Sequence, residues 1–364
     1  MVFCLRGIVP MAFLHILAFL SGLTLVLGTL RSAVRTFVVP RSINDRVTRT
    51  IFQVSRWLFG LRLRCAHTYA ARDGVMAFYA PVTLLCLPLV WVAVVSVGYT
   101  LMYWALGVAS WQSGFTVSGS SLLTLGFATL NGFPTTLLTF SEATIGLLLV
   151  ALLIAYLPTM YAAFSKREMA VTLLEVRAGS PPSAVELLSR YHRIGNVAQL
   201  RELWVGWESW FAELDETHTS LAALSFFRSP DPSHSWVTAS GAVLDAASLY
   251  LSCLEVPLAP EPALCLRAGF IALRRIADFF TIRYDRQPSP TDPISVRRDE
   301  FDVAWERLSA EGLPLKEDRE AAWLAFSGWR VNYDTVLLGL ATLTMAPEAP
   351  WSSDRARLAW GKEA

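Results

Sequence analysis

Long apolar runs dominate the first part of the chain. Residues 8–30, 76–106 and 142–165 each form a run long enough for a helix to cross a hydrocarbon core of roughly 30 Å. After Ser165 the apolar positions recur at helical spacing and are interrupted by proline-rich segments. The pattern predicts an all-α membrane protein with three transmembrane helices, followed by an all-helical domain in residues 166–364.

The first apolar run has an alternative interpretation as a signal peptide. Its apolar region exceeds the usual 7–15 residues of such a peptide, and no small-x-small cleavage motif precedes Arg31. We therefore interpret residues 1–30 as an amino-terminal transmembrane helix.

Charged residues indicate which side of the membrane each segment faces. Residues 31–75 contain nine arginines but only two acidic residues, and Lys166 and Arg167 directly follow the third apolar run. Short segments rich in arginine and lysine stay on the cytoplasmic side. We therefore expect a multi-pass protein of the plasma (inner) membrane, with its amino terminus outside and its C-terminal domain in the cytoplasm.

The basic segment 31–75 also contains apolar residues at helical spacing. These residues are Ile51, Val54, Trp57, Leu58 and Leu61. Their spacing is typical of an amphipathic helix that lies on the inner leaflet. A voltage sensor would instead place arginine at every third position of an apolar crossing, which this segment does not do. The segment is therefore predicted as a basic cytoplasmic linker with an amphipathic helix.

The chain has no charged residue in positions 74–141, which is unusual for a loop exposed to water. Within this stretch, residues 112–123 have the length of a short helix that dips into the membrane, and Thr124-Leu125-Gly126-Phe127-Ala128 follows. The order of outer helix, short helix, Thr-x-Gly-aromatic and inner helix spans residues 76–165. It resembles the two-transmembrane potassium-channel-like (pore-loop cation channel) family, whose filter is Thr-Val-Gly-Tyr-Gly.

This resemblance implies a re-entrant pore loop between the second and third crossings, and a homotetramer around a central axis. The residues that correspond to the ion filter are Thr124, Leu125, Gly126, Phe127 and Ala128. The resemblance implies that the Thr124 hydroxyl and the backbone carbonyls of residues 124–127 would replace the water shell of K⁺ or another monovalent cation. The resemblance also implies gating by a bend of the inner helix at Gly146 and Pro158. The cation is transported, so we expect no cofactor, no resident metal and no enzyme activity.

Two positions depart from the family's pattern. Ala128 replaces the last filter glycine, where left-handed backbone is expected and a Cβ costs about 1–2 kcal/mol. Thr129 stands where an acidic residue usually follows the filter. Two alternatives therefore stay open. One is an uncharged outer loop between ordinary helices, and the other is a non-conducting scaffold or sensor that retains the pore fold and binds a partner through its cytoplasmic domain.

Residues 166–364 carry several helix signals. Ser183 and Glu186 form a capping-box pattern, and Trp204, Trp207 and Trp210 share one helix face, which favours a buried core over a membrane surface. Further helices are predicted at residues 239–254, 262–284, 298–311 and 319–345.

The C-terminal domain gives no indication of its ligand or partner. It contains neither a G-x-G-x-x-G pattern nor a P-loop, a nucleophile elbow or a metalloprotease helix. Its histidines share no metal-ligand spacing, the five cysteines form no C-x-x-C pair, and the acidic run 213–216 is typical of a solvated helix face. The expected partners are the lipid bilayer, further copies of this chain and an unknown cytoplasmic ligand, and nucleic acid is not among them.

Overall fold

The residues that the computed structural model describes are 5–39, 46–195 and 200–355. Within them the regular structure is helical and includes no strand, so the predicted all-α fold is confirmed. The chain divides into two compact units: Met1–Arg64 with Phe78–Tyr161, and Cys65–Ala77 with Ala162–Ala364.

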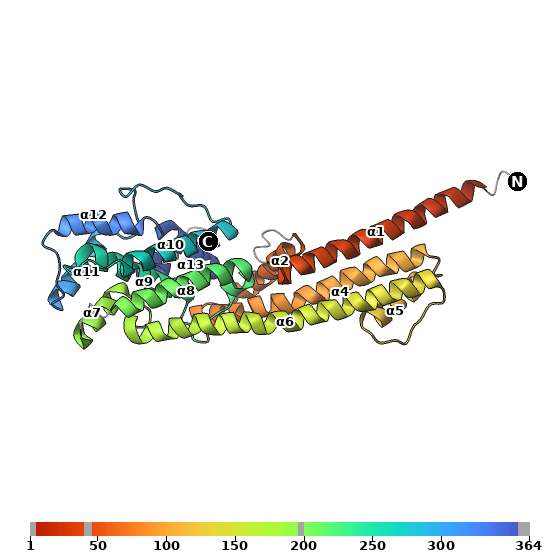
Figure 1. Cartoon of the computed structure of the whole chain (residues 1–364), viewed down its shortest axis with the longest axis horizontal. Coiled ribbons are helices and arrows are strands. Elements are labelled where there is room, and N and C mark those ends of the chain that lie inside the picture. Colours follow the sequence, from red (N-terminus) through yellow and green to blue (C-terminus); the bar gives the residue numbers. More distant parts are fainter. Residues whose placement is uncertain (1–4, 40–45, 196–199, 356–364) are drawn as a thin grey trace. The chain divides into compact units, whose positions relative to one another are not determined.

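Three helices are long and apolar enough to cross a membrane (Figure 1). They are α1 (Leu5–Phe37), α4 (Tyr79–Ala105) and α6 (Phe133–Ala178). They correspond to the three apolar runs, and they make the chain compatible with a membrane protein. Helix α6 begins at Phe133 rather than at Glu142, because Gly132 turns the chain with a φ of 118° and its carbonyl accepts a hydrogen bond from the Thr136 N–H at 3.0 Å.

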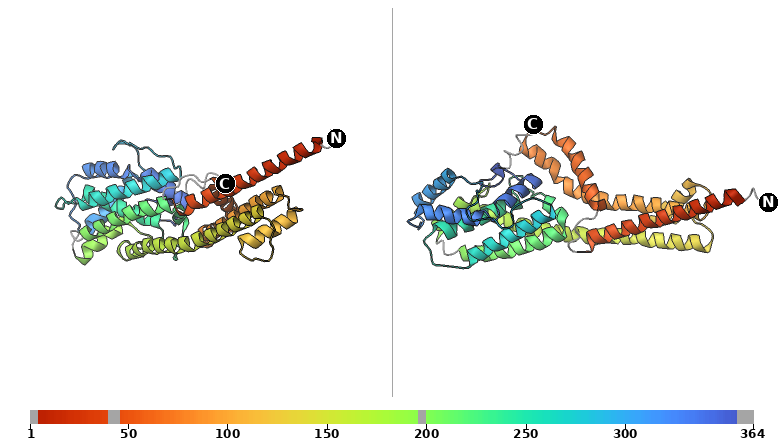
Figure 2. Two further views of the ribbon diagram at one scale, coloured as in Figure 1. Left: turned by 45° about the vertical axis from the view of Figure 1, so that its right-hand side comes forward. Right: turned by 90° about the horizontal axis from the view of Figure 1, so that it is seen from above.

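Small residues let α1 and α4 approach each other closely (Figure 2). A Cβ added to Gly22 would lie 2.3 Å from the carbonyl oxygen of Gly98, and a Cβ added to Gly98 would lie 2.8 Å from Val26. Close backbone approach at small residues is a common way for membrane helices to pack. The glycine pair therefore fixes where the two helices cross.

Two shorter helices follow α1 and belong to different units. Helix α2 (Arg46–Leu63) is part of the N-terminal unit, whereas α3 (Tyr69–Ala77) is part of the C-terminal unit. There an ion pair joins Asp73 Oδ1 of α3 to Arg228 Nη1 at 2.7 Å. The segment 31–75, predicted as one linker, is therefore divided between the two units.

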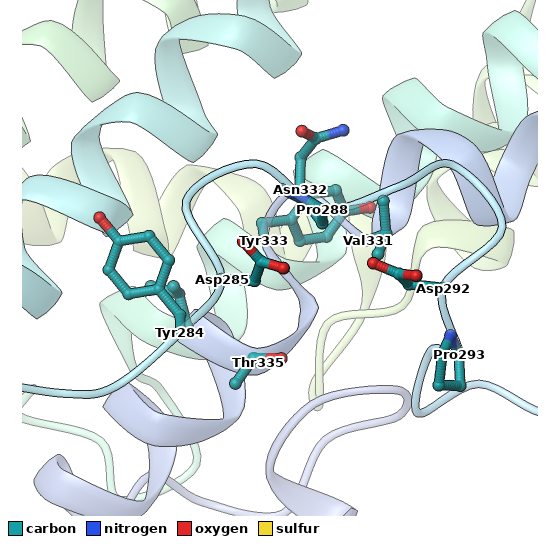
Figure 3. Close-up of a pocket in the computed structure, with 10 residues that line it drawn as sticks. Tyr284, Asp285, Pro288, Asp292, Pro293, Val331, Asn332, Tyr333 and Thr335 are labelled. Atoms are coloured by element: carbon teal, nitrogen blue, oxygen red, sulfur yellow. The ribbon is translucent and has the colours of Figure 1, made fainter.

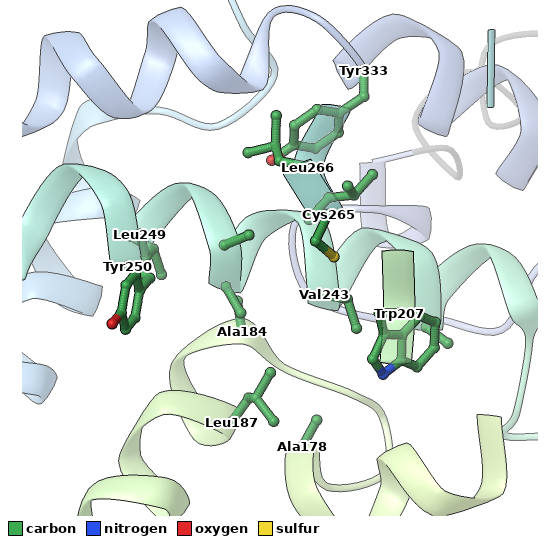
Figure 4. Close-up of a cluster of buried hydrophobic side chains, with 14 of the residues drawn as sticks. Ala178, Ala184, Leu187, Trp207, Val243, Leu249, Tyr250, Cys265, Leu266 and Tyr333 are labelled. Atoms are coloured by element: carbon green, nitrogen blue, oxygen red, sulfur yellow. The ribbon is translucent and has the colours of Figure 1, made fainter. Parts of the chain in front are cut away.

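The C-terminal unit is built around α9 (Trp236–Cys253), which is buried along almost its whole length. Its other helices are α7 (Ala184–Ile194), α8 (Leu200–Ser220), η2 (Ala222–Phe226), α10 (Glu261–Phe279), α11 (Arg298–Ala310), α12 (Arg319–Arg330) and α13 (Asp334–Thr344). Figure 4 shows side chains of α7, α8, α9 and α10 meeting in one core. Trp204, Trp207 and Trp210 of α8 are buried in that core, so their predicted role is confirmed.

The single helix predicted at residues 319–345 is wrong, because this segment forms the two helices α12 and α13. The side-chain amide of Asn332 donates to the carbonyls of Gly328 and Trp329, at 3.2 and 3.1 Å, and so satisfies the end of α12. The apolar spacing continues across the break and does not reveal it.

A buried ionic cluster joins α9, α12 and α13. The fully buried Arg330 donates to the carboxylates of Asp245 and Asp334, and the Tyr333 hydroxyl donates to Asp245 at 2.7 Å. Burial opposes the charge of Arg330, but the two carboxylates more than offset it and raise the pKa of the guanidinium. The guanidinium therefore stays charged inside the core.

Candidate pore segment

A short helix lies between α4 and α6, as predicted for residues 112–123. Helix α5 (Trp111–Leu122) begins at Ser110, whose side-chain oxygen accepts a hydrogen bond from the Ser113 N–H at 3.1 Å. Gly107, with a φ of 92°, turns the chain after α4. The turn at Gly107 and the cap at Ser110 together set the direction of α5 relative to α4.

Helix α5 packs against α4 and runs back along it in the opposite direction. A Cβ added to Gly114 would lie 3.4 Å from the Thr100 carbonyl oxygen, and one turn later the hydroxyl oxygens of Ser118 and Ser96 are 2.8 Å apart. Successive turns of α5 therefore meet successively earlier turns of α4. At 1.5 Å per residue, Ser96 lies about 13 Å before Ala105, the last residue of α4.

The end of α5 contacts α6 at Gly146. A Cβ added to Gly146 would lie only 2.0 Å from the carbonyl oxygen of Leu122. Gly146, predicted as a gating residue, thus sits where α6 accommodates the backbone of α5. Pro158 lies about 18 Å further along α6, which continues as a helix through it. The structure does not bring the two predicted gating residues together.

A buried carboxyl group connects α4, α5 and α6. Glu142 is fully buried and accepts hydrogen bonds from the Ser118 hydroxyl at 2.5 Å and from the Tyr103 hydroxyl at 2.9 Å. Sequence reasoning did not identify these two partners. The one available signal was that Glu142 is the only charged residue between Asp73 and Lys166.

The segment after α5 has a strongly turned backbone. Thr124 and Gly126 have φ values of 57° and 73°. The Ser120 carbonyl accepts hydrogen bonds from the N–H groups of Leu125 and Gly126, at 2.8 and 3.2 Å. The segment therefore folds back tightly onto the last turn of α5.

Ala128 does not adopt the left-handed backbone expected for the last filter position. The positive φ falls on Thr124 and Gly126 instead, so the cost of a Cβ in that region is borne by Thr124. Ala128 is held through its backbone, because its N–H donates to Ser120 Oγ at 3.0 Å. Ser120 is a further residue that sequence reasoning missed.

The other predicted filter residues face away from their own unit. Leu125 and Phe127 are 60% and 68% exposed, and Thr124 and Gly126 are also exposed. The structure therefore brings residues 124–128 together on one loop at the end of α5. The apolar side chains of Leu125 and Phe127 on this loop are not covered by other described residues.

The described residues of the C-terminal unit give no candidate metal site. Among the described residues, no group of three or more His, Cys, Asp or Glu could hold a metal ion. In the acidic run, Glu213 pairs with Lys166 at 2.8 Å and Asp215 pairs with Arg275. An open pocket between α12, α13 and the loop after α10 is shown in Figure 3, but its Asp292 already accepts a hydrogen bond from the Ser289 N–H.

Gly146→Ala is expected to destabilise the N-terminal unit by about 1–3 kcal/mol, because the added methyl group collides with the backbone carbonyl of Leu122 and forces α5 or α6 to shift. Thermal denaturation of the full chain in detergent, followed by fluorescence-detected size exclusion, measures this loss. Gly28→Ala in α1 is the matched control, since apart from its chain neighbours and the nearby backbone of α1 no atom lies within 4 Å of its Cβ position. Equal melting temperatures for both variants would contradict the contact.

The fold and this segment define an α-helical protein with three helices able to span a membrane and a short helix that returns between the second and third. Comparison with protein-family models, with curated proteins and with solved structures finds no match to this chain. Arguments about function therefore rest on the chain's own sequence and geometry.

Proposed function

We propose that the protein is a potassium-channel-like homotetramer that conducts monovalent cations passively through the loop of residues 124–128. In this proposal the protein resides in the plasma membrane with its amino terminus outside. The C-terminal unit lies in the cytoplasm, where it assembles or gates the pore.

The observation that carries the proposal is the antiparallel return of α5 along α4. The contacts of Gly114 with Thr100, Ser118 with Ser96 and Leu122 with Gly146 place the end of α5 well inside the span of α4 and α6. Non-helical backbone at that depth is tolerated when it lines a water-filled path or is covered by protein. Four copies around an axis would meet both conditions.

The same arrangement supplies the electrostatics that a cation needs. The carboxyl end of a helix carries a partial negative charge, and α5 ends at Leu122, two residues before Thr124. Backbone carbonyls of residues 124–127 would then replace part of the hydration shell of the ion. The chain supplies binding and orientation only, and no bond of the ion is made or broken beyond its coordination.

A second function is favoured by the backbone contacts of Ala128. Its N–H is bonded to Ser120 Oγ, and the Ser120 hydroxyl lies 3.3 Å from its carbonyl oxygen. This hydrogen bond occupies one of the two lone pairs of the Ala128 carbonyl oxygen and makes that oxygen a weaker ligand for an ion. This contact supports a non-conducting scaffold or sensor that retains the pore fold and binds a partner through its C-terminal unit.

Ion flux through the full chain in liposomes distinguishes the two functions. The channel predicts K⁺ flux above Na⁺ flux, and loss of both in Gly126→Val, because a β-branched residue does not tolerate the φ of 73°. Flux that appears only in Ala128→Gly would mean that Ala128 closes the loop. Absence of flux in both the unmodified chain and Ala128→Gly would support the scaffold. A particle with the mass of a monomer or dimer in detergent would exclude the tetramer.

A further inference from the structure

Helix α2 has two apolar faces, of which one packs within its own unit. On that face the rings of Phe52 and Phe59 lie 6.1 and 5.7 Å from the ring of Tyr79 in α4, and the Tyr79 hydroxyl donates to the Phe52 carbonyl at 3.1 Å. The second face is between 40% and 64% exposed and consists of Val54, Trp57, Leu58 and Leu61.

The exposed apolar face is accompanied by arginines. Arg49, Arg56, Arg62 and Arg64 are all exposed. On a helix of 3.6 residues per turn, Arg62 falls beside one edge of the apolar face, while Arg49 and Arg56 fall on the polar side. Long arginine side chains reach from such positions to a charged surface while their stems cover apolar surface.

Two contacts fix α2 at the ends of helices that are able to span a membrane. The hydroxyl oxygens of Thr48 in α2 and Thr36 in the last turn of α1 are 2.8 Å apart. Tyr79, whose hydroxyl donates to the Phe52 carbonyl one turn after Thr48, is the first residue of α4. Helix α2 therefore lies where α1 ends and α4 begins, at the level of a membrane surface.

We propose that α2 is an interfacial helix that binds anionic phospholipid. Its exposed apolar face inserts at the boundary between headgroups and acyl chains, with Trp57 at headgroup level. The four arginines bind the phosphate groups, which favours anionic over zwitterionic lipid. This role is independent of ion conduction.

The test uses bimane attached to the full chain at Leu58→Cys, with Gln53→Cys on the polar side of α2 as the matched control. Cys4, Cys65 and Cys86 are replaced by serine. Cys253 is buried and its pKa is raised to about 12 by that burial, and Cys265 is fully buried, so neither thiol reacts with the label.

The labelled protein is reconstituted into vesicles of equal parts phosphatidylcholine and phosphatidylglycerol, in which one lipid or the other carries brominated acyl chains. We expect brominated lipid to quench the label at position 58, with brominated phosphatidylglycerol about two-fold more effective. The label at position 53 is expected to respond to aqueous iodide instead.

The preference for phosphatidylglycerol is expected to fall to about one in the R49Q/R56Q/R62Q/R64Q variant, and in about 0.5 M salt, where charges are screened. Quenching of the position 58 label by iodide would overturn the proposal. If neither brominated lipid nor iodide quenches the label at position 58, protein covers this face and the proposal is also overturned. Equal quenching by the two brominated lipids in the chain with its four arginines would overturn it as well. None of these readouts requires ion flux.

Discussion

Replacing Asp245 with alanine is expected to lower the free energy of unfolding of the C-terminal unit by about 3–5 kcal/mol. The variant leaves the fully buried Arg330 with one carboxylate in place of two, and it removes one of the hydrogen-bond acceptors of the Tyr333 hydroxyl. A buried charge that loses its partner has no water to replace it. Urea unfolding of the full chain in detergent, followed by tryptophan fluorescence, measures the loss.

An exposed ion pair in the same unit provides the control. Asp299 pairs with Arg297 at 2.9 Å on the surface, and Asp299→Ala is expected to change the free energy of unfolding by less than about 1 kcal/mol. The triple variant Asp245→Leu/Arg330→Met/Asp334→Asn removes all three charges of the cluster together, so that no buried charge is left without a partner, and is expected to recover much of the loss. Similar small effects for Asp245→Ala and Asp299→Ala would show that Arg330 does not depend on Asp245.

The parts of the fold that sequence predicts well are those that depend on local spacing. The three long apolar runs and the extent of α5 follow from helix length and apolar composition, which need no knowledge of what packs where. The burial of the three tryptophans of α8 is also predictable from spacing, because three large apolar side chains on one helix face require a core to cover them.

The contacts that shape the candidate pore segment are not local, and sequence did not predict them. The bond from the Ala128 N–H to Ser120, and the bond from Ser118 to Glu142, depend on where the loop and α6 return in space. The resemblance to a filter placed left-handed backbone at Ala128, whereas the structure, in which the Leu125 and Gly126 N–H groups donate to the Ser120 carbonyl, has it at Thr124 and Gly126. Tertiary contacts decided the conformation of that segment, and residue type alone did not.

Glu142→Ala is expected to destabilise the N-terminal unit by about 3 kcal/mol or more. The variant leaves the hydroxyls of Ser118 and Tyr103 without their carboxylate acceptor, at about 1–3 kcal/mol each, and it opens a cavity among α4, α5 and α6. Glu142→Gln keeps the size and one carbonyl acceptor, and its amide can donate to the second hydroxyl, so it is expected to retain most of the stability.

Thermal denaturation of the full chain, together with hydrogen exchange of residues 111–128, separates these outcomes. Because Glu142 holds α5 and the proposed filter loop begins where α5 ends, Glu142→Ala is expected to increase exchange in α5 and to abolish flux. Glu142→Gln is expected to keep the slow hydrogen exchange of α5 and the ion flux of the unmodified chain. Equal damage by the two variants would mean that the charge of Glu142, and not its two hydrogen bonds, holds α5 in place.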